Sequence, residues 1–267
     1  MSRLSLTLSK LKSEKKKSLV TFLVAGDPNL DQSLDLMHVM AKSGADVIEL
    51  GVPFPRPKAE GPVIQKAHER ALQKKTSLNS CFDLVRCFRE INSVTPIILM
   101  GYMDSVETFG YENFCQNAAG VGVDGIILVD LIPEESQILR TLLDSYGVEL
   151  VLLMSPKTTE VRSKFICEAA RGFVYCISME GTTGQKGIDV DMLKTRLELL
   201  RPITTLPVLV GFGINSSKIA KSVGSISDGV IIGSALVDLI DKNIQAPAIM
   251  LDKISRFISG VKVALGR

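Results

Sequence analysis

The stretch SGADVIELG, residues 43–51, contains the unit from which the fold can be worked out. A small, flexible pair and an aspartate are followed directly by an apolar run with the length and composition of a buried β-strand. The same arrangement recurs in VGVDGIILVD, residues 121–130, and in SISDGVIIGS, residues 225–234. The repeating unit is therefore a helix, a tight turn and a strand.

Eight short apolar runs occur along the chain, and stretches with helical periodicity lie between them. The expected strands cover residues 19–25, 46–51, 96–102, 124–130, 149–155, 172–178, 207–213 and 228–234. The expected helices include residues 30–44, 77–91, 134–147, 160–172 and 190–201, with a further helix at 5–17 before the first strand and another at 250–265.

Apolar strands that alternate with helices indicate a parallel sheet covered by helices, and eight such units close into a barrel. No Pro/Gly-rich linker divides the sequence, so residues 1–267 are expected to form one domain. We therefore predict an α/β fold, a (β/α)8 TIM barrel with an extra N-terminal helix. A doubly wound open sheet is the alternative.

The composition excludes several classes of function. A net charge of +2, 5% aromatic residues and the absence of Trp provide neither the basic surface nor the stacking groups of a nucleic-acid-binding protein. No run reaches the roughly 18 apolar residues of a membrane helix, so a cytoplasmic protein is expected. The five cysteines lack CxxC spacing and are expected to be small buried residues, and His38 and His68 are expected to pack or face solvent rather than bind metal.

Polar residues at the carboxyl ends of the expected strands are candidates for the active site, because barrel enzymes place their chemistry there. These residues are Asp27, Glu49, Tyr102, Asp130 and Ser178. Glu49 is unusual because it lies inside an apolar run, between Ile48 and Leu50. Burial there would raise the pKa of its carboxyl group unless a cation paired with it.

Glycines at the ends of the last two expected strands predict a phosphate site. Gly213 and the pair Gly233 and Ser234 lie between strand and helix, where backbone N–H groups and a helix N-terminus can hold an anion. Gly184, in the loop after the sixth expected strand, could approach the same anion.

The sequence lacks the residues that several classes of reaction require. The sixth expected strand has no lysine for a Schiff base, the two histidines are misplaced for a catalytic metal, and no Ser or Cys has a nearby His to activate it. Acid–base chemistry on an apolar phosphate ester remains, with Glu49 able to hold or take a proton near neutral pH.

The sequence as a whole resembles the tryptophan synthase alpha chain family, from about Leu11 to the C-terminus. The resemblance rests on a series of motifs in matching order and spacing: FLVAGDP (22–28), GADVIELGVP (44–53), EGPVIQKA (60–67), LMGYMD (99–104), GVDGIILVD (122–130), GTTG (181–184), GFGI (211–214) and GSALV (233–237).

The resemblance implies a retro-aldol cleavage of indole-3-glycerol phosphate to indole and glyceraldehyde 3-phosphate, without a cofactor. It implies that Glu49 protonates the indole ring and then accepts a hydroxyl proton, and that Glu60 accepts the indole N–H. It also implies that the substrate contacts Phe22, Met100, Tyr102, Ile127, Val129, Leu153, Tyr175, Thr183, Phe212 and Ile232.

The sequence departs from the family pattern around the second carboxylate. The family normally has an Asp where Glu60 stands, and Arg56, Lys58 and Met179 replace other usual residues. Two positive charges next to Glu60 in the sequence are expected to draw its carboxylate away from the indole. The family resemblance also implies an α2β2 assembly with a β chain, with Arg56 and Lys58 in the loop that faces this partner.

Three functions follow as hypotheses: an active lyase, an impaired α chain that acts mainly as an allosteric activator of the β chain, or another phosphate-binding barrel with a changed substrate.

Overall fold

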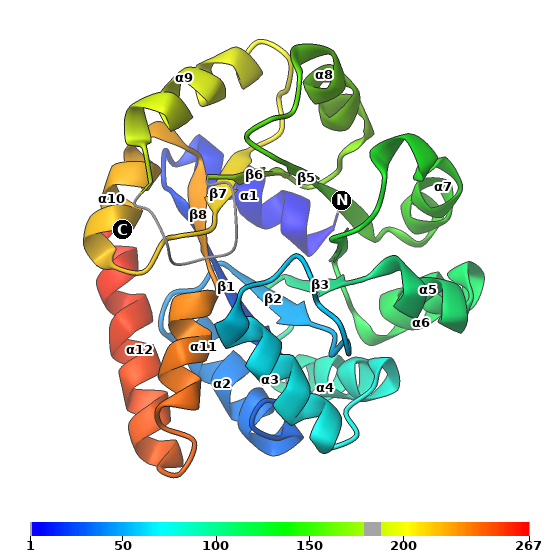
Figure 1. Ribbon diagram of the computed structural model, residues 1–267, viewed down its shortest axis with the longest axis vertical. Coiled ribbons are helices and arrows are strands. Elements are labelled where there is room, and N and C mark those ends of the chain that lie inside the picture. The colour runs from blue at the N-terminus through cyan, green and yellow to red at the C-terminus, as the bar shows by residue number, and fades with distance from the viewer. Residues whose placement is uncertain (1, 179–187, 267) are drawn as a thin grey trace.

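The computed structural model describes residues 2–178 and 188–266, and within these residues eight parallel strands form a closed barrel in chain order (Figure 1). The strands are β1 (Ser18–Val24), β2 (Val47–Gly51), β3 (Ile97–Gly101), β4 (Gly125–Leu128), β5 (Glu149–Met154), β6 (Val174–Ile177), β7 (Val208–Gly211) and β8 (Gly229–Ile232). The pairing of β1 with β8 closes the sheet. The predicted barrel is confirmed, and the open sheet is wrong.

Helices surround the strands in Figure 1. They are α1 (Arg3–Ser13), α2 (Leu30–Lys42), α3 (Pro62–Gln73), α4 (Leu78–Ile91), α5 (Met103–Phe109), α6 (Tyr111–Val121), α7 (Gln137–Tyr146), α8 (Glu160–Ala169), α9 (Val190–Leu200), α10 (Ser217–Ile226), α11 (Ser234–Asp241) and α12 (Pro247–Ala264), with a short 3-10 helix at Pro133–Glu135. The extra N-terminal helix is α1.

Alternation along the strands divides the core into two layers. In β1, Val20 and Phe22 belong to the cluster inside the barrel, whereas Leu19 and Leu23 belong to the cluster between strands and helices. Leu4 of α1 joins the inner cluster, so α1 covers the end of the barrel opposite the active-site loops. The same alternation places Glu49 on the inward side of β2.

The aspartate of the repeated unit has a structural role at the amino ends of the strands. Asp46, Asp124 and Asp228 each donate a backbone N–H to a residue of the preceding strand and accept the N–H of that same residue on a carboxylate oxygen. We call this arrangement the aspartate clip. It fastens β1 to β2, β3 to β4 and β7 to β8, and explains why the motif recurs.

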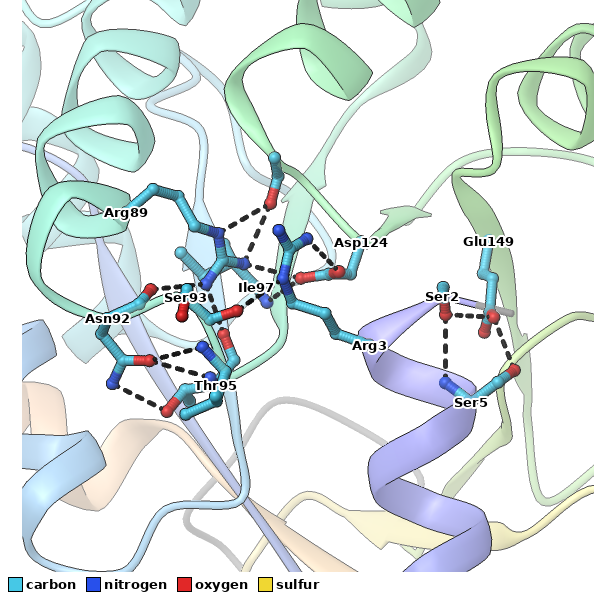
Figure 2. A network of polar contacts seen from close by, with 12 residues as sticks. Ser2, Arg3, Ser5, Arg89, Asn92, Ser93, Thr95, Ile97, Asp124 and Glu149 are labelled. Carbon is cyan, nitrogen blue, oxygen red and sulfur yellow. Dashed lines mark hydrogen bonds and ion pairs between the residues drawn. The ribbon is translucent and has the colours of Figure 1, made fainter.

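The clip at Asp124 is the centre of a wider polar network (Figure 2). Its carboxylate accepts the Ile97 N–H at 2.9 Å and forms ion pairs with Arg89 of α4 at 2.7 Å and with Arg3 of α1 at 3.0 Å. One buried carboxylate therefore joins two strands to two helices.

We expect the Asp124→Ala variant to lose about 3–5 kcal/mol of unfolding free energy, because it leaves a strand N–H and the partly buried Arg89 without their acceptor. Urea denaturation would measure the loss. The matched control is Asp83→Ala, whose ion pair with Arg86 is exposed on both sides. This control should lose less than about 1 kcal/mol, and equal losses for the two variants would contradict the role of the clip.

Candidate active site

A cavity lies at the carboxyl ends of the strands, and both predicted carboxylates line it. Its lining residues are Phe22, Glu49, Glu60, Gly61, Ile64, Met100, Tyr175, Phe212, Gly213, Ile214, Ile231, Gly233 and Ser234. Residues from β1, β2, β3, β6 and β8, from the turn after β7 and from the first turns of α3 and α11 with the segments before them therefore meet at one place.

Glu49 is 1% exposed, and its Oε2 atom has no hydrogen-bond partner among residues 2–178 and 188–266. It pairs in register with Phe22 of β1 and Ile98 of β3, both of which are apolar. Burial raises the pKa of Glu49 to about 8, and the nearby Glu60 carboxylate adds to the effect. Glu49 is therefore a protonated acid at neutral pH that can give up its proton close to that pH.

Glu60 has a different environment. It is also buried, but its Oε2 atom lies 2.6 Å from Nε2 of His68 on α3. Arg56 and Lys58 are exposed, whereas Pro57 between them is buried. The expectation that these two cations draw Glu60 away is therefore wrong for this structure, because the loop turns their side chains outward and Glu60 inward.

Two glycines allow aromatic side chains to enter the cavity. A Cβ atom at Gly51 would lie 2.8 Å from the Phe22 ring, and one at Gly211 would lie 2.3 Å from the Tyr175 hydroxyl. Either substitution would displace a ring. Tyr175 in turn meets Phe212 edge-on, with ring centroids 6.2 Å apart.

The turn after β7 is held in an uncommon conformation. Phe212 has a φ of 74°, a left-handed value that costs a non-glycine residue of order 1–3 kcal/mol. The Ser178 hydroxyl lies 2.6 Å from the Phe212 carbonyl oxygen and 2.8 Å from that of Gly211, which ties the turn to the end of β6. The turn brings Phe212 and Gly213 to the cavity wall.

The structure brings together only some of the predicted ring contacts. Phe22, Met100, Tyr175 and Phe212 line the cavity, whereas Ile127 is buried in the inner core beneath it. Val129 and Leu153 line a neighbouring depression over β4 and β5. Tyr102 stacks on Phe54, with ring centroids 4.3 Å apart.

The prediction for Ile232 is wrong. Its side chain belongs to the outer core between strands and helices, and Ile231 lines the cavity instead. A shift of one residue along a strand turns a side chain to the other face, because the strand period is two.

Of the predicted phosphate ligands, Gly213, Gly233 and Ser234 lie together at the cavity, with Gly233 at the N-cap of α11. Gly184, Thr183 and Met179 lie outside the described residues. The other strand-end residues have structural partners: Asp27 forms a two-point ion pair with Arg70, and Asp130 accepts the Met103 N–H at the start of α5.

The sequence patterns did not identify His68, Ile64 and Ile231 as site residues, because only the positions of these residues in space indicate that they belong to the site. It also predicted buried cysteines, whereas Cys87 on α4 is exposed. Across the described ranges, no helix has the length and apolar composition needed to span a bilayer, and no three His, Cys, Asp or Glu side chains are grouped as metal ligands.

A (β/α)8 barrel with two adjacent carboxyl groups in an apolar cavity at its carboxyl end defines a barrel enzyme of the acid–base class. The sequence profile of the tryptophan synthase alpha chain family matches residues 8–265. The chain belongs to this family, as the resemblance implied.

Individual relatives are similar to this chain over nearly its whole length. The tryptophan synthase alpha chain of Thioalkalivibrio sulfidiphilus is 44% identical over 265 residues, 99% of this chain and 100% of its own. The crystal structure of tryptophan synthase subunit alpha from Legionella pneumophila has a TM-score of 0.93 at 39% identity, covering 99% of this chain and 98% of that one. A tryptophan synthase structure from Mycobacterium tuberculosis has a TM-score of 0.89 at 28% identity, with 99% and 98% covered.

The raised pKa of Glu49 predicts a pH-dependent effect on stability. Between pH 4.5 and about 8 the unfolded chain ionises this group while the folded chain keeps its proton, so the native state loses stability as pH rises through that window. We expect the Glu49→Gln variant to gain stability relative to the original chain from pH 5 to pH 9, by up to about 5 kcal/mol.

Urea denaturation of both proteins across this pH range would measure the difference. The exposed Glu69 on α3 provides the matched control, Glu69→Gln. Its difference should stay within about 0.5 kcal/mol at every pH. A pH-independent difference for Glu49→Gln would show that Glu49 does not carry a raised pKa.

Proposed function

We propose that this chain catalyses the retro-aldol cleavage of indole-3-glycerol phosphate to indole and glyceraldehyde 3-phosphate. The observation that carries the proposal is Glu49, a buried carboxyl group that lines an apolar cavity and has no partner in the described part of the chain. The reaction needs a group that is protonated at neutral pH yet readily ionised, and the pKa of about 8 meets both needs.

Glu49 would act first as an acid and then as a base. It donates its proton to C3 of the indole ring, which leaves positive charge on the ring nitrogen. The resulting carboxylate accepts the proton of the side-chain hydroxyl as the bond between C3 and the side chain breaks. The bonding electrons return to the ring, the hydroxyl carbon becomes an aldehyde, and Glu49 ends protonated as it began.

Glu60 would act as an ionised hydrogen-bond acceptor for the indole N–H. It lines the same cavity as Glu49, so its charge would lie near the nitrogen that becomes positive. Stabilising charge where it develops in the transition state is a large term in enzyme catalysis. The two carboxyl groups therefore have separate tasks.

The remaining cavity residues would hold the two ends of the substrate. Phe22, Tyr175 and Phe212 provide flat apolar surfaces for a ring. Gly213, Gly233 and Ser234 provide backbone N–H groups and the N-terminus of α11 for the phosphate. Gly184 and Thr183 would complete the site, as the family resemblance implies.

We also propose that the chain assembles with a tryptophan synthase β chain. Arg56 and Lys58 are exposed and would face this partner. An α chain that turns over slowly and mainly activates its partner is the alternative. The burial of Glu60 away from both cations removes one ground for that alternative.

Replacing Glu49 should stop indole formation. We expect Glu49→Gln to lower kcat by about 10²–10⁴-fold, because the amide cannot transfer the proton. The original chain should lose kcat/KM as pH rises through about 8, where Glu49 gives up its proton. The assay is steady-state indole formation with the β chain present, and Glu69→Gln is the control.

An original chain that forms indole at about 1 per second or faster would exclude the impaired alternative. Equal rates for Glu49→Gln and the original chain would exclude Glu49 as the acid.

A methyl group at Gly233 should weaken phosphate binding. The added atom would lie 3.4 Å from the Phe22 ring, an ordinary contact, so the barrel should accept it. It would occupy space beside the N-terminus of α11, and we expect Gly233→Ala to bind inorganic phosphate about tenfold more weakly or worse. Calorimetric titration would measure this. Gly120→Ala in α6, where a Cβ atom meets nothing within 4 Å, is the control. Unchanged affinity for Gly233→Ala would place the phosphate elsewhere.

A further inference from the structure

His68 contacts both ends of the loop that carries Glu60. Its Nε2 atom lies 2.6 Å from Glu60 Oε2, and its Nδ1 atom accepts the backbone N–H of Phe54 at 3.0 Å. The histidine is 1% exposed and lies on the buried face of α3. One imidazole therefore bridges residues 54 and 60, at the start and the end of the loop.

The contact with Phe54 fixes the tautomer of the imidazole. Nδ1 faces an N–H donor, so it carries no proton and acts as the acceptor. The ring proton is then on Nε2, which donates it to the Glu60 carboxylate.

The helix that carries His68 is itself held firmly. Arg70 of α3 pairs with both carboxylate oxygens of Asp27, at 2.7 and 2.9 Å, and also with Asp241 of α11. Gln65 donates its side-chain amide to the Glu60 carbonyl oxygen at 2.8 Å. His68 therefore projects from a rigid element rather than from the loop that it contacts.

We propose that His68 is a positioning residue that fixes the Glu60 carboxylate toward the indole nitrogen of the substrate. This inference rests on the proposed function. Glutamate has one more rotatable bond than the aspartate usual in the family, so its carboxylate can occupy more positions. The Nε2–H donor selects one position by engaging Oε2. The histidine thus compensates for the longer side chain.

Two substitutions separate the two contacts of the imidazole. The amide nitrogen of glutamine lies near the position of Nε2, so His68→Gln keeps the donor to Glu60 and loses the acceptor for Phe54. The amide oxygen of asparagine lies near the position of Nδ1, so His68→Asn keeps the loop contact and cannot reach Glu60. The pair distinguishes positioning of the carboxylate from anchoring of the loop.

We expect His68→Asn to lower kcat for indole formation by about a hundredfold with less than about threefold change in KM, because misplacement by roughly 1 Å has a cost of that size. His68→Gln should retain kcat within about threefold. The assay uses the full chain with the β chain present. A His68→Asn variant that cleaves the substrate at the original rate, or an activity order reversed between the two variants, would overturn the proposal.

A double substitution tests whether His68 acts through Glu60. In the Glu60→Gln background, His68→Asn should cause no further loss of kcat, because the carboxylate that it positions is gone. A further hundredfold loss there would overturn the proposal. Urea denaturation identifies variants that fail to fold. If His68→Asn does not fold, the kcat of His68→Gln still tests the proposal. A kcat for His68→Gln as low as that of Glu60→Gln would overturn it.

A spectroscopic readout separates this inference from the proposed reaction. The nitrogen-15 shifts of His68 in the free chain should show the Nε2–H tautomer, and the Nε2 resonance should move in Glu60→Gln. A chain that forms no indole but shows this tautomer would contradict the proposed function and leave the Glu60–His68 hydrogen bond established. A chain that forms indole but carries the proton on Nδ1 would contradict the positioning role of His68 alone.

Discussion

The structure of the site depends on one constraint: Glu49 is a buried carboxyl group that forms no ion pair with any residue that the structure describes. At neutral pH the folded chain keeps the Glu49 proton that the unfolded chain releases, which lowers the free energy of unfolding, so the surrounding fold must be stable enough to tolerate that loss. The barrel places the proton-transfer group and the main stabilising polar contacts at different ends of its strands. The aspartate clips and the Asp124 ion pairs fasten the amino ends of the strands, while Glu49 faces the cavity at their carboxyl ends. Chemistry and stability therefore occupy opposite ends of one sheet.

The two carboxyl groups at the cavity have different neighbours. Glu49 pairs in register with apolar residues, so desolvation keeps its proton. Glu60 is similarly buried, but its Oε2 atom lies 2.6 Å from Nε2 of His68. The charge on Glu60 then helps to raise the pKa of Glu49. Two neighbouring acids with such different surroundings are typical of sites where one transfers protons and the other stabilises charge.

Sequence patterns could predict the barrel, because each strand is an apolar run whose length and position do not depend on distant partners. They could also identify Glu49, since a lone acid in such a run is conspicuous. They could not determine which face of the sheet the Ile232 side chain occupies, because an error of one residue along a strand moves a side chain to the opposite face. They could not identify His68 either. Its role depends on the rotation of α3 relative to the loop, and Gly61 and Pro62 at the helix start show where α3 begins but not which side chain it turns inward.

The loop before α3 shows why proximity in sequence misleads an electrostatic argument. Arg56 and Lys58 lie within four residues of Glu60, yet backbone hydrogen bonds from Lys58 N to Arg56 O and from Glu60 N to Pro57 O turn the chain tightly there. The turns leave both cations in solvent, where water screens their charge. His68, eight residues away, reaches the carboxylate directly because a helical turn brings it back. Which side chain contacts the Glu60 carboxylate is therefore decided by the direction of the turn rather than by the charges that the loop contains.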